Sequence, residues 1–171
     1  MDTRESRRTA VVYWILIFLG MLCAIALFRS FVVDIRTVEG ISMEDTLHDG
    51  DRVLIRKFAV TDVDRYDIVL CRQGDTTLVK RVVGLPGDHI QMSKTGYLWI
   101  NGEPAPDVYQ IDADRQQMDP VDVTLEEDQY FVLGDNRLNS LDSRYYGPFS
   151  GEDLCGVYLC RIWPLPYVNR N

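Results

Sequence analysis

Two side chains in this sequence have the chemistry of a nucleophile and its base. Ser42 stands in the run Gly-Ile-Ser-Met-Glu-Asp-Thr-Leu, and Lys80 stands in Leu-Val-Lys-Arg-Val-Val. In an extended strand, Lys80 would share one face with the apolar residues two positions away on either side. Burial of that face disfavours the ammonium form, and bringing a lysine pKa from about 10.4 to about 7–8 costs roughly 4 kcal/mol. A neutral amine near the Ser42 hydroxyl would be a general base beside a nucleophile.

Each of these residues alone has a plainer interpretation. A lysine on an edge strand can extend its ammonium group into water, and a serine can be only a turn or cap residue. Gly40 lies two residues before Ser42 and would allow a ligand to approach the backbone closely. The Ser42 N–H could then donate to an oxyanion. His48 and His89 are rival bases, but both stand in charged, turn-like contexts, and we expect them at the surface.

A third segment is dense in short polar and charged residues. From position 134 it reads Gly-Asp-Asn-Arg-Leu-Asn-Ser-Leu-Asp-Ser-Arg-Tyr-Tyr-Gly, directly after the apolar run Tyr130–Leu133. Alternating acids and arginines suit a buried, hydrogen-bonded network of ion pairs. A solvated loop is the alternative, but so many short polar side chains favour a rigid support for a site.

The elements that position these residues begin with an apolar segment. Residues 9–28 carry no charged side chain, and at about 1.5 Å per residue they span about 30 Å, the thickness of a bilayer core. More arginines precede the segment than follow it closely, which predicts residues 1–8 in the cytoplasm and residues 29–171 outside. A cleaved signal peptide is disfavoured because the apolar run is too long. A buried core helix is disfavoured because the segment has no polar face.

After about residue 34 the sequence changes to short β-like runs separated by turn signals such as Pro-Gly-Asp and Asn-Gly. No long stretch there has helical periodicity. We therefore expect a mostly antiparallel β domain behind one N-terminal transmembrane helix. Residues 102–122 are polar and contain three prolines, which predicts a surface excursion. The predicted strands are Arg52–Lys57, Asp67–Arg72, Leu78–Val83, Tyr97–Ile100, Tyr130–Leu133 and Gly156–Ile162.

Composition limits the other function classes. A net charge of −8 and a pI of about 4.7 do not suggest a nucleic-acid surface. The four cysteines form no Cys-x-x-Cys pattern and only two histidines are present, so we expect no zinc site of ordinary spacing. Acyl transfer by a serine and a lysine would require no metal or organic cofactor. Cys155 and Cys160 would face opposite sides of one strand, whereas a bridge from Cys71 to either of them stays open.

The three segments together resemble the bacterial type I signal peptidases, in particular their single-span, Gram-positive-like members. That family carries Ser-Met-x-Pro-Thr-Leu, Lys-Arg-Val-x-Gly-x-Pro-Gly-Asp and Gly-Asp-Asn-x-x-x-Ser-x-Asp-Ser-Arg behind an N-terminal span. Here the motifs begin at Ser42, Lys80 and Gly134 in the same order and spacing. The resemblance implies an antiparallel β-sheet or partly open barrel, the catalytic fold shared with self-cleaving repressors.

The resemblance also implies a role for each matched residue. Ser42 would be the nucleophile and Lys80 the general base, with Ser140 hydrogen-bonding the base. A supporting shell of ion pairs would consist of Asp142 and Arg144, with Asp135 and Arg137 behind them. An extended substrate would add a strand beside 35–38 and 77–79. The residues expected to contact it are Ile35, Val38, Gly40, Met43, Thr77 and Val79.

The implied protein is a membrane-bound serine endopeptidase that removes N-terminal signal peptides from exported preproteins through a Ser-Lys acyl-enzyme mechanism. Its partners would be secretory preproteins with small residues before the cut and the lipid bilayer, without nucleic acid. Its place would be the plasma membrane, as a single-pass protein with the catalytic domain outside.

One departure from the family pattern concerns the loop after the nucleophile. The proline of the serine motif is Asp45 here. Proline would fix φ, whereas aspartate loosens the loop and adds a negative charge that would favour protonated Lys80. We therefore expect a slower enzyme, or one that needs higher pH. The alternative is a catalytically impaired, membrane-anchored β domain with a binding or accessory role. A self-cleaving repressor would need a DNA-binding domain where the apolar segment stands.

Overall fold

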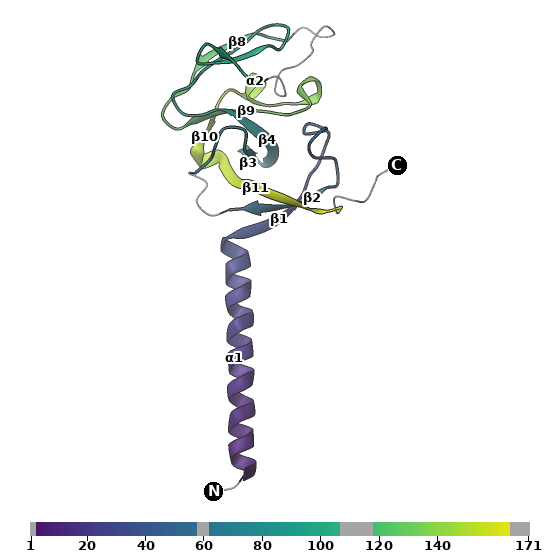
Figure 1. Ribbon diagram of the computed structural model, residues 1–171, viewed down its shortest axis with the longest axis vertical. Coiled ribbons are helices and arrows are strands. Elements are labelled where there is room, and N and C mark those ends of the chain that lie inside the picture. Colours follow the sequence, from purple (N-terminus) through teal and green to yellow (C-terminus); the bar gives the residue numbers. More distant parts are fainter. Residues whose placement is uncertain (1–2, 58–61, 107–117, 165–171) are drawn as a thin grey trace.

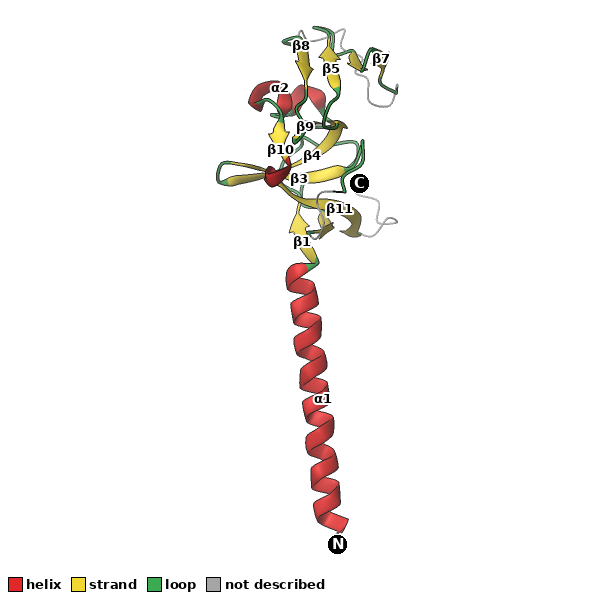
Figure 2. Ribbon diagram, turned by 90° about the vertical axis from the view of Figure 1, so that its left-hand side faces the viewer, coloured by secondary structure: helices red, strands yellow, loops and turns green. Residues whose placement is uncertain are grey.

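One long helix leads into a β-rich domain (Figure 1). The computed structural model describes residues 3–57, 62–106 and 118–164 of the 171-residue chain. Helix α1 (Thr3–Phe31) extends away from the strands (Figure 2) and, at about 1.5 Å per residue, is about 44 Å long. Its stretch Ala10–Leu27 is long and apolar enough to cross a membrane, and none of it is buried. The helix ends next to β1 (Val33–Thr37), so it joins the β domain through almost no linker.

The larger sheet has seven strands in the order β1-β2-β11-β3-β4-β9-β10, with every neighbouring pair antiparallel. The predicted mostly antiparallel fold behind one apolar helix is confirmed. Within the described residues neither sheet closes into a barrel. The other strands of this sheet are β2 (Arg52–Arg56), β3 (Ile68–Gln73), β4 (Thr76–Gly84), β9 (Gln129–Leu133), β10 (Phe149–Ser150) and β11 (Leu154–Trp163).

The smaller sheet has four strands in the order β7-β6-β5-β8 and lies at the end of the β domain far from α1 (Figure 1). Its strands are β5 (His89–Met92), β6 (Leu98–Ile100), β7 (Glu103–Pro104) and β8 (Val121–Thr124). The two ends of the predicted excursion 102–122 are therefore edge strands of a sheet. Residues 107–117 lie outside the described part of the chain.

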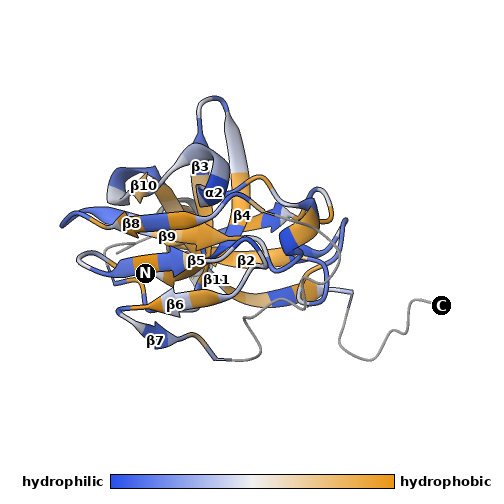
Figure 3. Cartoon of the chain, turned by 90° about the horizontal axis from the view of Figure 1, so that it is seen from above, coloured by the Kyte–Doolittle hydropathy of each residue, from blue (hydrophilic) through white to orange (hydrophobic). Residues whose placement is uncertain are grey.

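Both faces of the larger sheet are covered by apolar side chains. Ile68 and Leu70 of β3 pack in one buried cluster, whereas Val69 and Cys71 pack in another on the opposite face. A third cluster joins β9 to the smaller sheet. Figure 3 shows apolar residues along the interior strands β9 and β11 and hydrophilic residues on edge strand β7. A side chain that points inward from the middle of the larger sheet is therefore removed from water.

The remaining elements are short. Helix α2 (Ser143–Tyr146) and the 3₁₀ turns Arg137–Asn139 and Gly151–Asp153 connect the last strands of the larger sheet. All four cysteines are free. Cys71 and Cys155 pack against clusters on different faces of the sheet, an arrangement that does not favour a bridge between them.

Candidate active site

The fold brings Ser42 and Lys80 into direct contact. The loop after β1 carries Ser42, strand β4 carries Lys80, and Lys80 Nζ lies 2.7 Å from Ser42 Oγ in a hydrogen bond. The two residues are 38 positions apart in the sequence, so the contact depends on the tertiary fold. Their distance is that expected of a base poised to take a hydroxyl proton.

The environment of Lys80 favours the neutral amine. Lys80 is 2% exposed and pairs across the strands with Val69 of β3. Burial lowers the pKa of Lys80 below its ordinary value, the negative charge of Asp142 partly opposes that shift, and the positive charge of Arg144 adds to it. The neighbouring Cys71 supplies no counter-charge at neutral pH, because burial raises the pKa of its thiol.

A cleft of about 380 Å³ opens beside the Ser42–Lys80 pair. Its walls are the end of β1 and the first half of β4. Among the described residues, β1 is the last strand of its sheet, and β9 pairs with β4 only from Arg81 onward. Both walls therefore present strand edges without a partner, which an extended peptide could pair with. The lining residues are Arg36, Thr37, Glu39, Ser42, Leu70, Asp75, Thr76, Thr77, Leu78, Val79 and Lys80.

The predicted substrate-contacting residues divide into three groups. Thr77 and Val79 line the cleft as described above. Val38 and Met43 are 2% and 1% exposed and pack in the core beneath it. Ile35 lies within β1, and Gly40 lies in the following turn at φ 85°, a conformation that favours glycine. The sequence did not single out Arg36, Thr37 and Glu39, which line the cleft and are each adjacent in the chain to a predicted residue.

Asp142 is the centre of the supporting network. Its carboxylate is 0% exposed and accepts hydrogen bonds from Ser140 Oγ at 2.7 Å, the Gly134 N–H at 3.0 Å and Arg144 Nε at 2.8 Å. The Ser140 hydroxyl is thus directed to Asp142, and no hydrogen bond joins it to Lys80 in the described structure. A side chain at Gly134 would collide with Ser140 Oγ and the Ser42 carbonyl, which explains the glycine.

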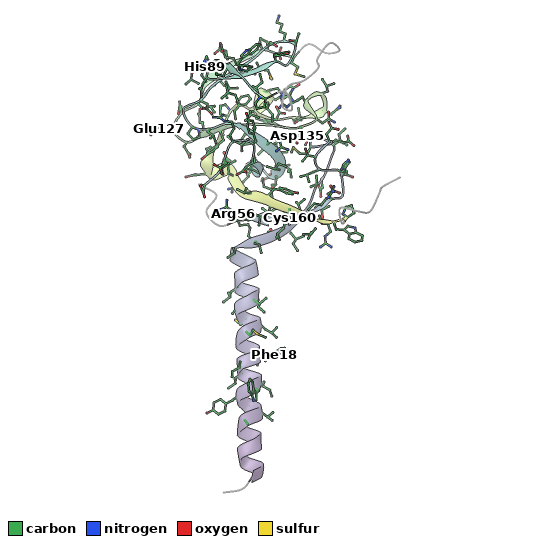
Figure 4. The ribbon with its side chains drawn as sticks, viewed as in Figure 1. Phe18, Arg56, His89, Glu127, Asp135 and Cys160 are labelled. Carbon is green, nitrogen blue, oxygen red and sulfur yellow. The ribbon has the colours of Figure 1, made fainter. Side chains whose placement is uncertain are left out.

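Asp135 forms its ion pair with Arg81 of β4. Two parallel hydrogen bonds of 2.8 and 2.7 Å join the pair, and the Thr46 hydroxyl donates to the same carboxylate at 2.6 Å. Figure 4 marks Asp135 within the β domain, well apart from Phe18 on the helix. Arg137 lies behind this network: it is 6% exposed, its Nε and Nη1 have no hydrogen-bond partner among the described residues, and burial lowers its pKa to about 10.

Asn136 connects the acidic segment to the nucleophile. Its backbone N–H donates to the Ser42 carbonyl at 3.0 Å, and its side-chain amide donates to the Ile41 carbonyl at 3.1 Å. Sequence reasoning did not assign this residue a role. The only signal was its place in the Gly-Asp-Asn run, which says nothing about a partner more than ninety positions away.

Asp45 has an unusual backbone conformation, with φ at 90°. Proline cannot adopt it, because its ring fixes φ near −65°. Aspartate tolerates left-handed conformations better than most residues. The side chain is exposed, and the acidic groups that raise the pKa of Lys80 are Asp142 and Asp135 rather than Asp45. The loop thus departs from the family pattern in conformation as well as in residue type.

The histidines take no part in this contact. His48 lies 3.9 Å from the Asp51 carboxylate, and His89 Nε2 lies 2.7 Å from Asp122 Oδ1 in the smaller sheet. Among the described residues no cluster of three or more His, Cys, Asp or Glu side chains could hold a metal ion.

A buried lysine in contact with a half-buried serine, beside an open-edged cleft, defines a site suited to acyl transfer by a serine peptidase. The chain matches the family "signal peptidase, peptidase S26" over residues 11–163. It is 37% identical over 150 residues to a probable signal peptidase I-2 of Synechocystis sp., covering 82% of this chain and 67% of that protein. It is 34% identical over 180 residues to a signal peptidase I of Bacillus amyloliquefaciens, covering 98% and 96%.

A solved structure of a signal peptidase I from Enterococcus faecalis is 28% identical, with a TM-score of 0.48, and the match covers 56% of this chain and 96% of that one. The extent of the family match and the two relatives show that the chain belongs to the signal peptidase family, peptidase S26. The predicted resemblance to bacterial type I signal peptidases is confirmed.

Proposed function

We propose that this protein removes N-terminal signal peptides from exported preproteins, with Ser42 as nucleophile and Lys80 as general base. The observation that carries the proposal is the 2.7 Å contact between the Ser42 hydroxyl and an amine that is 2% exposed. Family membership supports the substrate class, because the similar proteins are named signal peptidase I.

In the acylation step, neutral Lys80 takes the proton of Ser42 Oγ as that oxygen attacks the scissile carbonyl. The resulting ammonium gives its proton to the departing amine of the mature protein, and the signal peptide remains as an ester on Ser42. Lys80 then takes a proton from a water molecule that attacks the ester. Release of the signal-peptide carboxylate returns the proton to Ser42 and the amine to its neutral form. The mechanism requires no metal or organic cofactor.

The supporting residues keep the site dry and ordered. Asp142 and Arg144 form an ion pair with side chains 0% and 5% exposed, and Ser140 donates to that carboxylate. We assign Ser140 to fixing Asp142, whose charge acts on Lys80, and Asp135 and Arg137 to the layer behind this ion pair.

The substrate would lie as an extra strand between β1 and β4. Both strands run toward the Ser42–Lys80 pair, β1 toward the loop of Ser42 and β4 toward Lys80 itself. A peptide parallel to both would place the residues before the cut along 35–38 and 77–79. Thr77 and Val79 would contact it directly, with Ile35 and Gly40 at the opposite wall. The buried Val38 and Met43 would form the floor.

The membrane arrangement follows from α1. We propose that residues 10–27 cross the bilayer with the N-terminus in the cytoplasm and the β domain outside. Because β1 begins directly after α1, one wall of the cleft would start at the membrane surface. That position suits a substrate whose cleavage site emerges just beyond its own apolar segment, and it makes the bilayer a second partner.

The direct test is incubation of the full chain in detergent with a preprotein that has alanine before its cleavage site. The wild type should produce the mature protein, and Ser42→Ala should produce none. Ser93→Ala, in the turn between β5 and β6, is the matched control and should cleave normally. Absence of cleavage by the wild type, or cleavage by Ser42→Ala, would reject the proposal.

The replacement of the family proline by Asp45 favours one rival, a binding domain with impaired catalysis. That rival predicts retention of the preprotein without an acyl-enzyme. Rapid quenching of the wild type with the same preprotein distinguishes the two, because a peptidase should accumulate or turn over an ester on Ser42 and Ser42→Ala should not.

A further inference from the structure

The peptide bond between Ile41 and Ser42 carries two groups with different tasks. Its N–H is that of Ser42, the proposed donor to the oxyanion. Its carbonyl oxygen accepts hydrogen bonds from Asn136 Nδ2 and from the Glu44 N–H, both at 3.1 Å. The next carbonyl, that of Ser42, accepts the backbone N–H of Asn136 at 3.0 Å. Asn136 therefore holds the peptide planes on both sides of the nucleophile.

We propose that Asn136 is a positioning residue that fixes and polarises the oxyanion-binding peptide through the Ile41 carbonyl. This inference rests on the proposed peptidase function and deepens it. The Asn136 side chain would help to stabilise the tetrahedral intermediate without contacting the substrate.

The physical reason is the geometry of a trans peptide. The carbonyl and the N–H of one planar peptide point in opposite directions, so a donor that fixes the oxygen also fixes the direction of the N–H. A hydrogen bond accepted by the oxygen polarises the amide and strengthens the bond that its N–H donates. Such preorganised donors stabilise an oxyanion without any reorganisation during the reaction.

The surroundings hold Asn136 in the required orientation. Asn139 Nδ2 donates to Asn136 Oδ1 at 3.2 Å, which leaves the Asn136 amide nitrogen directed at Ile41. The preceding Asp135 is held by its paired bonds to Arg81. The asparagine thus stands on a turn that is tied to β4, the same strand that carries Lys80.

A merely structural role would be expected to affect substrate binding and catalysis together, whereas the proposed role acts on the transition state. The test uses full-length wild type, Asn136→Ala and the nearly isosteric Asn136→Asp, whose carboxylate would face the Ile41 carbonyl. Three quantities are measured: kcat and KM for a preprotein, inhibition by a peptide aldehyde ending in alanine, and inhibition by the corresponding cleaved peptide. The aldehyde forms a tetrahedral adduct with an oxyanion, and the cleaved peptide does not.

We expect both variants to lose about tenfold or more in kcat, less than loss of a direct oxyanion donor costs. Aldehyde inhibition should weaken by a similar factor, while KM and inhibition by the cleaved peptide stay within about twofold. The pH midpoint of kcat should not move, because Lys80 keeps its surroundings. Asn139→Ala removes the neighbouring amide but leaves the bond to Ile41, so its loss should be smaller.

The proposal is overturned by unchanged kcat in both variants, by reduced kcat with unchanged aldehyde inhibition, or by an equal loss in Asn139→Ala. Failure of both variants to fold, judged by circular dichroism and thermal unfolding, would also overturn it, because Asn136 would then support the fold alone. Absence of cleavage by the wild type would instead reject the proposed function.

Discussion

The two sheets of this protein are both antiparallel and both cover an apolar cluster, yet they place their polar networks differently. In the larger sheet, Lys80 is buried and its Nζ contacts Ser42. In the loop after β9, Asp142 is also buried, and its carboxylate accepts hydrogen bonds from Gly134 and Ser140. In the smaller sheet, His89 and Gln91 of one strand bond Asp122 of its neighbour at the surface. Figure 4 shows His89 at the end of the domain away from the helix.

The difference shows where this fold can support chemistry. A charged or polar group in water gains little from any one partner, because solvent competes and screens. A buried group depends on its partners, because leaving it unpaired costs several kcal/mol. The larger sheet therefore fixes the protonation and orientation of its polar groups, whereas the smaller sheet leaves them to solvent.

The largest expected effect is that of Lys80. Lys80→Met should lower the cleavage rate by about 10³-fold or more, because among the described residues Lys80 is the base that contacts Ser42. Lys80→Arg should fail equally, because a guanidinium does not release its proton. In urea unfolding, Lys80→Met should be at least as stable as the wild type, since an apolar side chain replaces a buried amine. Retained cleavage by either variant would show that the buried amine of the larger sheet is not the catalytic base. The two sheets would then not differ in their ability to support this chemistry.

The Asp142 network should give the next largest effect. Asp142→Asn leaves Arg144 buried without its counter-charge and should lower the free energy of unfolding by about 3–5 kcal/mol. Cleavage should fall as well, because one of the two carboxylate oxygens, which together accept from Gly134, Ser140 and Arg144, is replaced by an amide donor. Asp122→Asn is the matched substitution in the smaller sheet and should leave the cleavage rate unchanged. Equal effects of the two substitutions on unfolding and cleavage would contradict the comparison.

Substitutions at two residues with positive φ should have smaller effects on stability and cleavage. Asp45 and Asn101 both have positive φ, at 90° and 55°, one in the nucleophile loop and one in a turn of the smaller sheet. Asp45→Pro should destabilise the protein by about 3 kcal/mol and reduce kcat, because proline forces the loop to rearrange. Asp45→Gly should be neutral or stabilising by about 1 kcal/mol.

For Asn101→Pro we expect lower thermal stability with unchanged kcat in the folded protein, because that turn lies away from the Ser42–Lys80 pair. If Asp45→Pro instead preserved both stability and kcat, the left-handed conformation at Asp45 would be refuted. The sequence alone suggested that proline would stiffen this loop. Preserved stability and kcat in Asp45→Pro would support that expectation, whereas their loss would support the positive φ at Asp45.

The smallest effect is expected for His89→Gln. This substitution removes the imidazole ring that contacts Asp122 but leaves the larger sheet untouched. The cleavage rate and its pH profile, measured on the preprotein between pH 6 and pH 10, should match those of the wild type. A shifted profile would mean that the smaller sheet is coupled to the Ser42–Lys80 pair.

Much of the fold could be predicted from the sequence because the strands of the larger sheet are apolar runs bounded by turn signals, as in β4, β9 and β11. The contact of Ser42 with Lys80 could be expected only through the family motifs, since it joins two elements far apart. Strand β8 was missed although Val121–Thr124 alternates apolar and polar residues, because nearby prolines suggested a loop. The pairing of Asp135 with Arg81 instead of Arg137 could not be predicted, because tertiary geometry chooses among several arginines.

The lowered pKa of Lys80 determines how stability and activity should change with pH. Because the folded protein holds Lys80 at a lowered pKa, the unfolded chain binds more protons between that value and 10.5. The contribution of Lys80 to stability therefore rises with pH across that window. Activity should rise as the folded-state amine loses its proton, with a midpoint below the ordinary lysine value.

The most direct test is the ionisation of Lys80 itself. The chain contains only three lysines, so the ¹³C NMR signals of their ε carbons can be followed in the full-length protein in detergent, with Lys80→Met to assign the signal. A Lys80 midpoint below 10.5 is the predicted result. A midpoint at or above 10.5 would contradict a neutral amine held beside Ser42.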